Sequence, residues 1–236
     1  MQILKACVIG VALLASSTQA AEFIVNGGFE TGNYTGWTAN VQGGSNGGLF
    51  IVPSAGTGPV SGLAYATNAN GGNFFSITDM NGPGSYSLTQ SFTLATSTTV
   101  TISFDHFANN YAGVTFNNGR DYTNNPNQNA VVDLLLGSAG AFSELPGDVV
   151  AVLYGPGSDS FNNPNPWTSY SSTLTLAAGT YTLRFAETDN QSFFNQGVDN
   201  VSVMSLVPEP TTWAMLLIGF GAVGAMTRRT RKSVAA

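Results

Sequence analysis

Alternation of apolar and polar residues, broken by frequent turn formers, constrains the fold of this chain more than any other feature of its sequence. Apolar positions recur with a period of two, which is the period of a β-strand with one buried face. Two such runs are Leu88, Phe92 and Leu94, and Val100, Ile102 and Phe104. The 28 glycines and many asparagines supply turns, and no helical pattern longer than one turn precedes residue 210. We therefore predict an all-β fold, an antiparallel β-sandwich of the jelly-roll type.

Further segments predict strands of two kinds. Ala130–Leu136 and Val149–Tyr154 are nearly continuous apolar runs, so we expect strands that are buried on both faces. The segment 174–185 alternates around an Ala-Ala-Gly turn at 177–179, which predicts a β-hairpin. The second strand of that hairpin is expected to bury Tyr181, Leu183 and Phe185.

Residues 1–20 have the layout of a secretory signal peptide. Lys5 precedes an apolar run over 6–15, and small or polar residues then lead to a cleavage site after Ala20. Cys7 lies before the apolar run instead of ending it, so a lipoprotein signal is not indicated. Removal of this segment leaves a mature protein without cysteine, which excludes disulfides as a source of its stability.

The last thirty residues, 207–236, form a second special segment. The Pro208-Glu209-Pro210 sequence can neither continue a helix nor donate to a β-ladder. An uncharged stretch over 211–227 follows, and it is a little shorter than the roughly 20 apolar residues of a full membrane span. A basic cluster, which would stay on the cytoplasmic side, ends the chain. We expect a single hydrophobic helix that stays in the inner membrane only transiently.

This order of parts resembles the PEP-CTERM sorting signal of Gram-negative bacteria, in its PEPxxWA variant. The matching residues are Pro208, Glu209, Pro210, Trp213 and Ala214, followed by Gly219-Phe220-Gly221 and by the arginines Arg228 and Arg229. The resemblance implies that exosortase, a membrane protease-transpeptidase, recognises the tail, cuts near the motif and releases or re-attaches the protein outside. The alternative is a simple C-terminal membrane anchor.

Two further motifs open and close the central domain, residues 21–206. The opening segment, which starts with a short strand at 23–25, contains the pattern N-G-x-F-E-x-G-x-x-x-G-W over 26–37. The closing segment Gly197–Val203 contains a D-x-V pattern. Together, and in this order, they resemble jelly-roll domains of the galactose-binding-like and carbohydrate-binding-module type. In the opening loop, we expect Phe29 and Trp37 to be buried.

The same resemblance implies a structural Ca²⁺ between the two motifs. Its side-chain ligands would be Glu30 of the opening motif and Asp199 of the closing strand. Carboxylates and backbone carbonyls are the oxygen ligands that Ca²⁺ takes, and the Asn26–Gly28 turn could supply carbonyls. The alternative is that Glu30 caps a turn and that Asp199 is a solvated strand residue.

The charge of the central domain excludes one class of partner. It contains 12 acidic residues, and its basic residues are Arg120 and Arg184. Two arginines cannot neutralise a phosphate backbone, so nucleic-acid binding is excluded.

Residues for the common catalytic sites are missing. His106 is the single histidine, and we expect it at the end of a strand. Without cysteine, further histidines or a G-x-S-x-G motif, the sequence indicates neither a nucleophilic triad nor a His-rich zinc site. A carboxylate pair for glycoside hydrolysis could come from Glu144, Glu187 or Asp189, but nothing selects a pair. We therefore predict that the protein is not an enzyme.

Polar loops at 41–48, 108–129 and 155–167 interrupt the strands. Aromatic rings beside amides suit sugars, because rings stack on C–H faces while amides bond hydroxyl groups. The candidate ligand-binding residues are Trp167, Tyr111 and Tyr122. The alternative is that Asn and Gly merely supply turns in these loops.

These observations predict an exported, non-catalytic protein of the cell surface or of an exopolysaccharide matrix such as a biofilm. It would consist of a signal peptide (1–20), a jelly-roll domain (21–206) and a sorting signal (207–236), and it would bind polysaccharide weakly. A secreted polysaccharide-active enzyme and a purely structural matrix protein are the alternatives.

Overall fold

The computed structural model describes residues 20–65, 71–112, 119–124, 126–157, 164–206 and 219–221. The expected signal peptide and nearly all of the expected sorting segment lie outside these residues, although 219–221 are helical. Residues 21–206 form a compact unit. Within the described part of the chain, no helix is long and apolar enough to cross a membrane.

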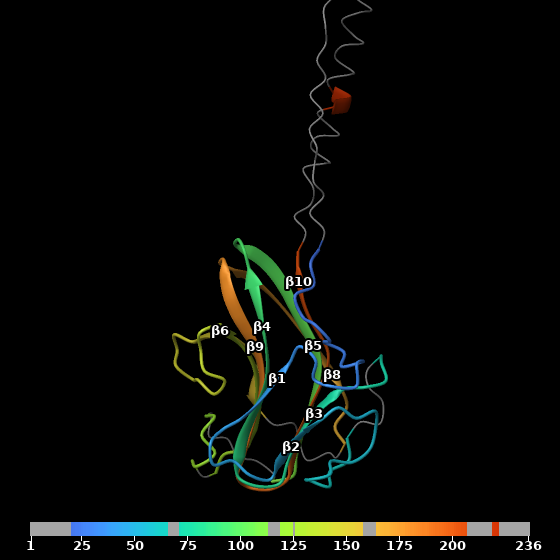
Figure 1. The fold of residues 1–236 in the computed structure, drawn as a ribbon, viewed down its shortest axis with the longest axis vertical. Coiled ribbons are helices and arrows are strands. Elements are labelled where there is room, and N and C mark those ends of the chain that lie inside the picture. Colours follow the sequence, from blue (N-terminus) through green and yellow to red (C-terminus); the bar gives the residue numbers. More distant parts are fainter. Residues whose placement is uncertain are drawn as a thin grey trace, which may run out of the picture. The chain divides into compact units, whose positions relative to one another are not determined.

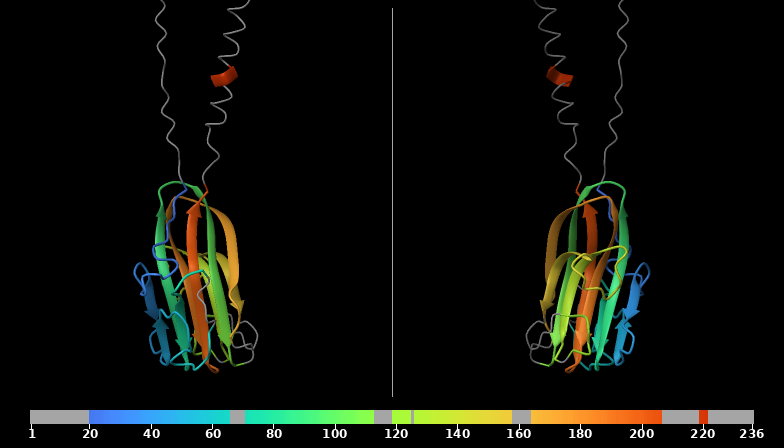
Figure 2. Two further views of the ribbon diagram at one scale, coloured as in Figure 1. Left: turned by 90° about the vertical axis from the view of Figure 1, so that its right-hand side faces the viewer. Right: turned by 90° about the vertical axis from the view of Figure 1, so that its left-hand side faces the viewer.

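The compact unit is a sandwich of two antiparallel five-stranded sheets, as predicted (Figures 1 and 2). Sheet I has the strand order β1-β4-β9-β6-β7, and sheet II has the order β2-β3-β10-β5-β8. The strands are β1 (Thr38–Val41), β2 (Gly48–Ile51), β3 (Ser76–Met80), β4 (Gly84–Leu94), β5 (Thr98–Asn110), β6 (Asn129–Leu136), β7 (Val149–Gly157), β8 (Thr168–Leu176), β9 (Gly179–Asp189) and β10 (Phe194–Ser205). Most connections after β3 cross from one sheet to the other, which is the jelly-roll arrangement.

The apolar core lies between the sheets. The alternating apolar residues of β4 and β5 that the sequence indicated belong to this one buried cluster. Trp37 and Phe29 are buried in it, with exposed fractions of 7% and 0%, and their rings stack at a centroid distance of 5.4 Å. The predicted burial of both residues is confirmed. The opening motif therefore closes the sandwich over its core.

Two predicted strands differ from the structure. β6 is buried as expected, but β7 is an edge strand, in which Val150 and Val152 are 38% and 54% exposed. The segment expected at 23–25 forms no strand. It is attached to β10 by a hydrogen bond from the Phe23 N–H to the Val203 carbonyl (2.9 Å) and by an isolated β-bridge between Glu22 and Met204. An apolar run alone does not tell an edge strand from a central one.

The expected β-hairpin over 174–185 is also wrong. β8 pairs with β5 in sheet II, whereas β9 lies between β4 and β6 in sheet I. The turn at 177–179 therefore passes from one sheet to the other. Leu176 and Tyr181 both point into the core from opposite sheets, so the same alternation arises without pairing of the two strands.

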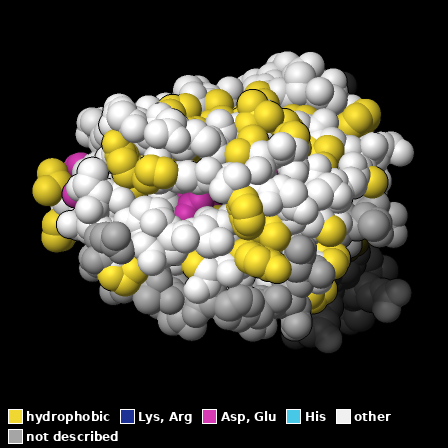
Figure 3. Space-filling model, turned by 90° about the horizontal axis from the view of Figure 1, so that it is seen from below, with side chains coloured by type: hydrophobic (Ala, Val, Ile, Leu, Met, Phe, Trp, Pro, Cys, Tyr) yellow, Lys and Arg dark blue, Asp and Glu magenta, His cyan; other side chains and the backbone are white. Residues whose placement is uncertain are grey.

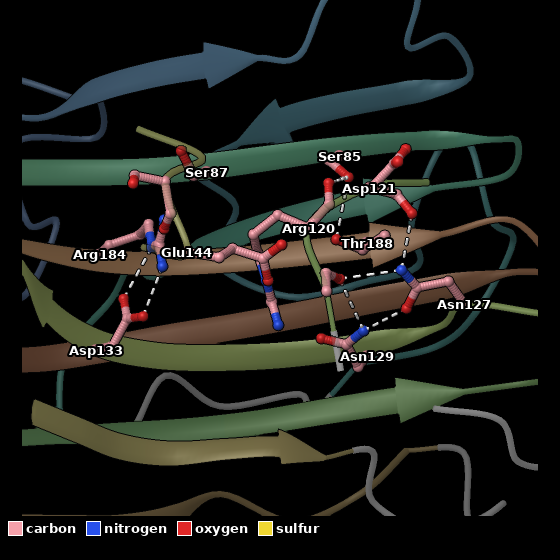
Figure 4. Close-up of polar contacts among 12 residues, drawn as sticks. Ser85, Ser87, Arg120, Asp121, Asn127, Asn129, Asp133, Glu144, Arg184 and Thr188 are labelled. Carbon is pink, nitrogen blue, oxygen red and sulfur yellow. Dashed lines mark hydrogen bonds and ion pairs between the residues drawn. The ribbon is translucent and has the colours of Figure 1, made fainter. Parts of the chain in front are cut away.

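Loops cover part of the outer face of sheet I (Figure 4). Arg184, which points outward from β9, is 1% exposed and donates from Nε and Nη2 to Asp133 of β6 at 2.8 and 2.6 Å. Its Nη1 donates to the carbonyl oxygens of Ala141 (3.1 Å) and Ser143 (2.9 Å). One buried side chain thus ties the segment 137–148 to the sheet.

Both sheets end together at the bottom of the domain in Figure 1. Here β5 and β9 end and β10, β4 and β6 begin, as the pairs Asn110–Phe194, Asp189–Gly84 and Thr188–Asn129 show. We call this part of the sandwich the loop end. The connections 81–83 and 190–193 lie there, together with the described residues that follow β5 and precede β6.

Candidate functional site

Two of the three predicted ligand-binding aromatic residues lie at the loop end. Tyr111 follows β5 directly and is 52% exposed, with its ring 6.2 Å from that of Phe193. Its backbone N–H donates to the Phe193 carbonyl at 3.0 Å. Tyr122 is half-buried, and its hydroxyl donates to the Gly43 carbonyl at 3.2 Å. Tyr111 and Phe193 together present an accessible aromatic surface.

Trp167 lies elsewhere. It is half-buried, and its ring meets those of Phe75 (5.3 Å) and Phe107 (4.6 Å) nearly at right angles. These residues belong to a second apolar cluster, separate from the main core. Phe107 points away from the interior of the sandwich, because its neighbour His106 points into it. The described contacts of Trp167 are those of a packing residue.

Amide side chains hold the turn that carries Phe193. Gln128 donates to Asn110 Oδ1 at 2.8 Å, and its Oε1 accepts from the backbone N–H groups of Gln191 and Ser192, both at 3.1 Å. Asn190 Oδ1 accepts from the Asn127 N–H at 2.7 Å. The turn at 190–193 is therefore fixed from two sides, and the sequence did not single out Gln128 or Phe193.

Two carboxyl groups lie inside the loop end. Tyr181, Leu183 and Phe185 of β9 face the core, and the same alternation continues to Glu187 and Asp189. Both acidic residues have an exposed fraction of 0%. Figure 3, which views the domain from this end, shows an acidic side chain in a central hollow among hydrophobic side chains. Of the carboxylates that the sequence left open, the structure brings Glu187 and Asp189 together. It places Glu144 on the surface, beside Arg120 at 3.6 Å.

Hydrogen bonds satisfy little of this carboxyl pair. Asp189 Oδ1 accepts from the Gln191 N–H at 3.1 Å, whereas Asp189 Oδ2 and both Glu187 oxygens have no hydrogen-bond partner among the described residues. Burial, and then the charges of Asp189 and Asp79, raise the pKa of Glu187 well above its ordinary value, with a smaller opposite effect of the Gln196 N–H. Burial raises the pKa of Asp189 to about 7, against nearby backbone N–H groups. Burial therefore favours the protonated, neutral form of Glu187.

His106 is not at a strand end, as the sequence suggested, but four residues before the end of β5. It is fully buried between the sheets, with its ring 4.4 Å from that of Tyr154. Nε2 of Gln196 donates to Nε2 of His106 at 3.0 Å, which requires the tautomer with the proton on Nδ1. Burial lowers the pKa of His106 to about 3, so the ring is neutral.

The two residues of the expected calcium site lie against the same glycine. A Cβ on Gly28 would be in ordinary contact with Glu30 Cγ (3.7 Å) and Asp199 Oδ1 (3.8 Å), whereas the carboxylate of Glu30 accepts from the N–H groups of Asn73 (2.8 Å) and Phe74 (3.1 Å). Asp199 is 1% exposed, and its Oδ1 accepts from the Asn200 N–H at 2.7 Å. The Phe74 N–H, and then that of Asn73, hold the pKa of Glu30 below its ordinary value, despite an opposite effect of burial. Within the described residues, no group of three or more acidic, histidine or cysteine side chains lies close enough to share a metal ion.

A comparison with known protein families decides the nature of the C-terminal segment. A family model described as the PEP-CTERM protein-sorting motif matches residues 206–232. The tail is a PEP-CTERM sorting motif. It indicates export and processing by exosortase at the membrane. Apart from residues 206 and 219–221, the PEP-CTERM tail lies outside the described structure, including Pro208, Glu209, Pro210, Trp213, Ala214, Arg228 and Arg229.

No curated protein matches the chain. Among solved structures, an apo form cyclase from Fischerella sp. is 19% identical with a TM-score of 0.49, over 80% of this chain and 98% of that one. TmCBM61 in complex with β-1,4-galactotriose is 13% identical with a TM-score of 0.46, over 79% and 99%. The enzymatically active domain of tailspike protein 4 of bacteriophage CBA120 is 12% identical with a TM-score of 0.48, and only 21% of its length is covered. At these identities and scores, the similarities carry no functional argument for the domain that precedes the PEP-CTERM tail.

Proposed function

We propose that this protein is an exported, non-catalytic component of the cell surface or of an extracellular polysaccharide matrix. The observation that carries this proposal is the PEP-CTERM motif at 206–232. The signal peptide at 1–20 starts export, and the apolar stretch at 211–227 holds the chain in the inner membrane for a time. Exosortase then acts at Pro208-Glu209-Pro210 and delivers the domain to the surface or the matrix.

We further propose that the loop end binds glycans weakly through Tyr111 and Phe193. The exposed ring of Tyr111, beside the half-buried ring of Phe193, offers the kind of surface on which a pyranose ring stacks. Beside them lies the exposed side chain of Gln191, whose Nε2 donates to Asn190 Oδ1 at 2.8 Å and would exchange that bond for one to a sugar hydroxyl group. The hydrogen bonds that Gln128 makes to the 190–193 turn favour binding, because little ordering remains to be done when a ligand arrives.

Burial of the acidic groups supports a non-catalytic function. Glu187 and Asp189 have the shifted pKa values that are common at active sites. However, neither is exposed, so a polymeric substrate cannot reach them in this conformation. His106 is equally inaccessible.

A structural Ca²⁺ is part of the proposal. It would be held by Glu30 and Asp199, and it would neutralise the buried carboxylate of Asp199 and join the opening motif to the closing strand. The ion would add stability and take no part in glycan binding.

A glycan array with the secreted mature protein tests the proposed binding. We expect selective binding of some polysaccharide fragments, and at least about a tenfold loss of affinity in Tyr111→Ala, because a stacking contact is worth roughly 0.5–1.5 kcal/mol beyond the apolar area it buries. Leu145→Ala is the matched control, since Leu145 is 66% exposed and belongs to the 137–148 segment. A folded protein that binds no glycan would instead be a structural matrix protein, and cleavage of an arrayed glycan would show an enzyme.

A further inference from the structure

The interior of the sandwich changes character along its length. Its middle is lined by apolar residues such as Leu183 and Phe185, whereas its loop end contains Glu187 and Asp189, the next two inward-facing residues of β9. A buried polar atom without a partner costs free energy, and native proteins contain few of them. Both oxygens of Glu187 and Asp189 Oδ2 are such atoms.

The groups packed around the pair supply no positive charge. On the flanking strands of sheet I, Glu187 pairs with Tyr86 of β4 and Ala130 of β6. On the facing sheet lie Gln196 of β10 and the neutral His106 of β5, and the further charges that act on the pair are negative, from Asp79 of β3 and between the two acids themselves. Arg120 and Arg184, the basic residues of the domain, belong to the network on the outer face of sheet I.

Protonation can neutralise the buried charge of the two carboxyl groups and provide a hydrogen-bond donor. A protonated carboxyl group is a hydrogen-bond donor, whereas an ionised one only accepts. Gln196, which is 1% exposed, also has a buried acceptor, Oε1, without a partner. A proton on Glu187 could therefore be donated to an unpaired acceptor inside the loop end, and it would remove a buried charge at the same time.

We propose that protons on Glu187 and Asp189 keep the loop end of the sandwich closed, and that this end opens as the external pH rises. Asp189 links the pair to the surface, because its Oδ1 holds the Gln191 N–H of the 190–193 turn. When both carboxyl groups are ionised, their mutual repulsion and the cost of burying them favour a conformation that admits water. The turn at 190–193 is bonded directly to the pair through the Gln191 N–H, so we expect the opening to involve this turn and to break its bonds to Gln128. This inference does not depend on glycan binding.

The direction of the effect follows from the pKa shifts. Both carboxyl groups have raised pKa values in the folded protein, to about 7 for Asp189, so the folded state keeps protons that the unfolded state has lost. Stability then falls as the pH rises from the unfolded values, near 4, through the folded ones. His106 has the opposite effect on stability below about pH 6.5. There it is protonated only in the unfolded state, so its contribution makes stability rise with pH. Between pH 6.5 and 8, the pH dependence of stability therefore reports on the carboxyl pair without a contribution from His106.

Thermal unfolding of the mature protein in excess chelator tests this inference. We expect the melting temperature to fall as the pH rises from 6.5 to 8, with about one proton released on unfolding near pH 7. Glu187→Gln, which mimics the protonated side chain, should melt higher than the wild type at pH 8 and show a flatter profile. Asp189→Asn serves as a second variant if Glu187→Gln does not fold. Glu144→Gln, a surface carboxyl, should keep the wild-type pH dependence.

Hydrogen exchange locates the opening. After correction for intrinsic rates, amide protection in 187–196 should fall between pH 6.5 and 8 in the wild type but not in Glu187→Gln. Protection of the central part of β4, around Leu88, should change little. A wild-type profile that is flat in this window, an unchanged slope in both variants, or a uniform loss of protection over the whole domain would overturn the proposal. None of these results bears on whether the closed form binds a glycan.

Discussion

Single residues hold the opening loop of the domain in place. Trp37 stacks on Phe29, contacts Phe185 at 5.9 Å and donates from Nε1 to the Asn26 carbonyl at 3.1 Å. Asn26 and Phe29 both have a positive φ of 53°, a backbone region that costs free energy for residues other than glycine. The stacked rings offset that cost, which explains why a loop with so many glycines has one conformation.

Truncating Trp37 should therefore destabilise the domain strongly. We expect Trp37→Ala to lower the free energy of unfolding by about 3–5 kcal/mol, the usual cost of removing a buried Trp. That is a large part of a typical total of about 5–15 kcal/mol. Urea unfolding measures the change, and Leu145→Ala should stay within about 0.5 kcal/mol of the wild type. A Trp37→Ala protein as stable as that control would mean that the stack contributes little.

Glu30 and Asp199 allow a test of the proposed cation. Binding to the folded state alone adds RT ln(1 + [Ca²⁺]/Kd), or about 2.7 kcal/mol at a hundredfold excess over Kd. We expect excess chelator to lower the melting temperature of the wild type, and we expect Asp199→Asn and Glu30→Gln to remove this sensitivity. Asp121→Asn, which changes a carboxylate at the loop end, should retain it. If chelator leaves the wild-type melting curve unchanged, the two carboxylates bind no ion that matters for stability.

At the scale of elements, the segment 137–148 depends on one buried ion pair. We expect Arg184→Met to lower the free energy of unfolding by about 3–5 kcal/mol, because Asp133 would remain as an unpaired buried charge. The double variant Arg184→Met/Asp133→Leu should recover much of this loss, since it removes both charges. Limited proteolysis should show faster cutting within 137–148 in both variants, because both lose the bonds to the Ala141 and Ser143 carbonyls. Equal stability of the single and double variants would contradict this explanation.

The sequence predicted the strands better than their partners. Alternation identified β4, β5 and β9, because a strand with a buried face has a period of two wherever it lies, and a continuous apolar run identified β6. It could not show that β8 and β9 belong to different sheets, since pairing depends on residues far away in the chain. β3 was missed because its five residues, Ser-Ile-Thr-Asp-Met, are all buried although three are polar.

One feature of the candidate site could have been predicted from the sequence, and two others could not. Counting by two from Tyr181, Leu183 and Phe185 leads directly to Glu187 and Asp189, so their inward orientation could have been read from the sequence. Their burial could not, because it requires Gln196 and His106 from the other sheet to close the same end. Nor could Phe193 be recognised beside Tyr111, because the two residues are joined only through the pairing of β5 with β10.

At the scale of the whole molecule, the PEP-CTERM tail should decide where the protein goes. We expect replacement of Pro208, Glu209 and Pro210 by alanine to leave the chain uncut in the inner membrane, because the prolines present the extended backbone that proteases require. Cell fractionation and the mass of the protein in each fraction measure this. Replacing Pro53, Pro59 and Pro83 instead gives a control with the same number of prolines removed from the exported domain. Normal processing of the tail variant would show that exosortase does not need the Pro-Glu-Pro sequence to recognise the tail.

The burial of both arginines affects how the domain resists proteases outside the cell. Residues 21–206 contain no lysine, and Arg120 and Arg184 are 3% and 1% exposed. Trypsin-like proteases cut only after these two residue types, so the folded domain offers them no accessible bond. Digestion would begin only after the outer face of sheet I had come apart. A protein built in this way would persist among secreted proteases of that specificity, and its rate of tryptic cleavage would report how often it unfolds.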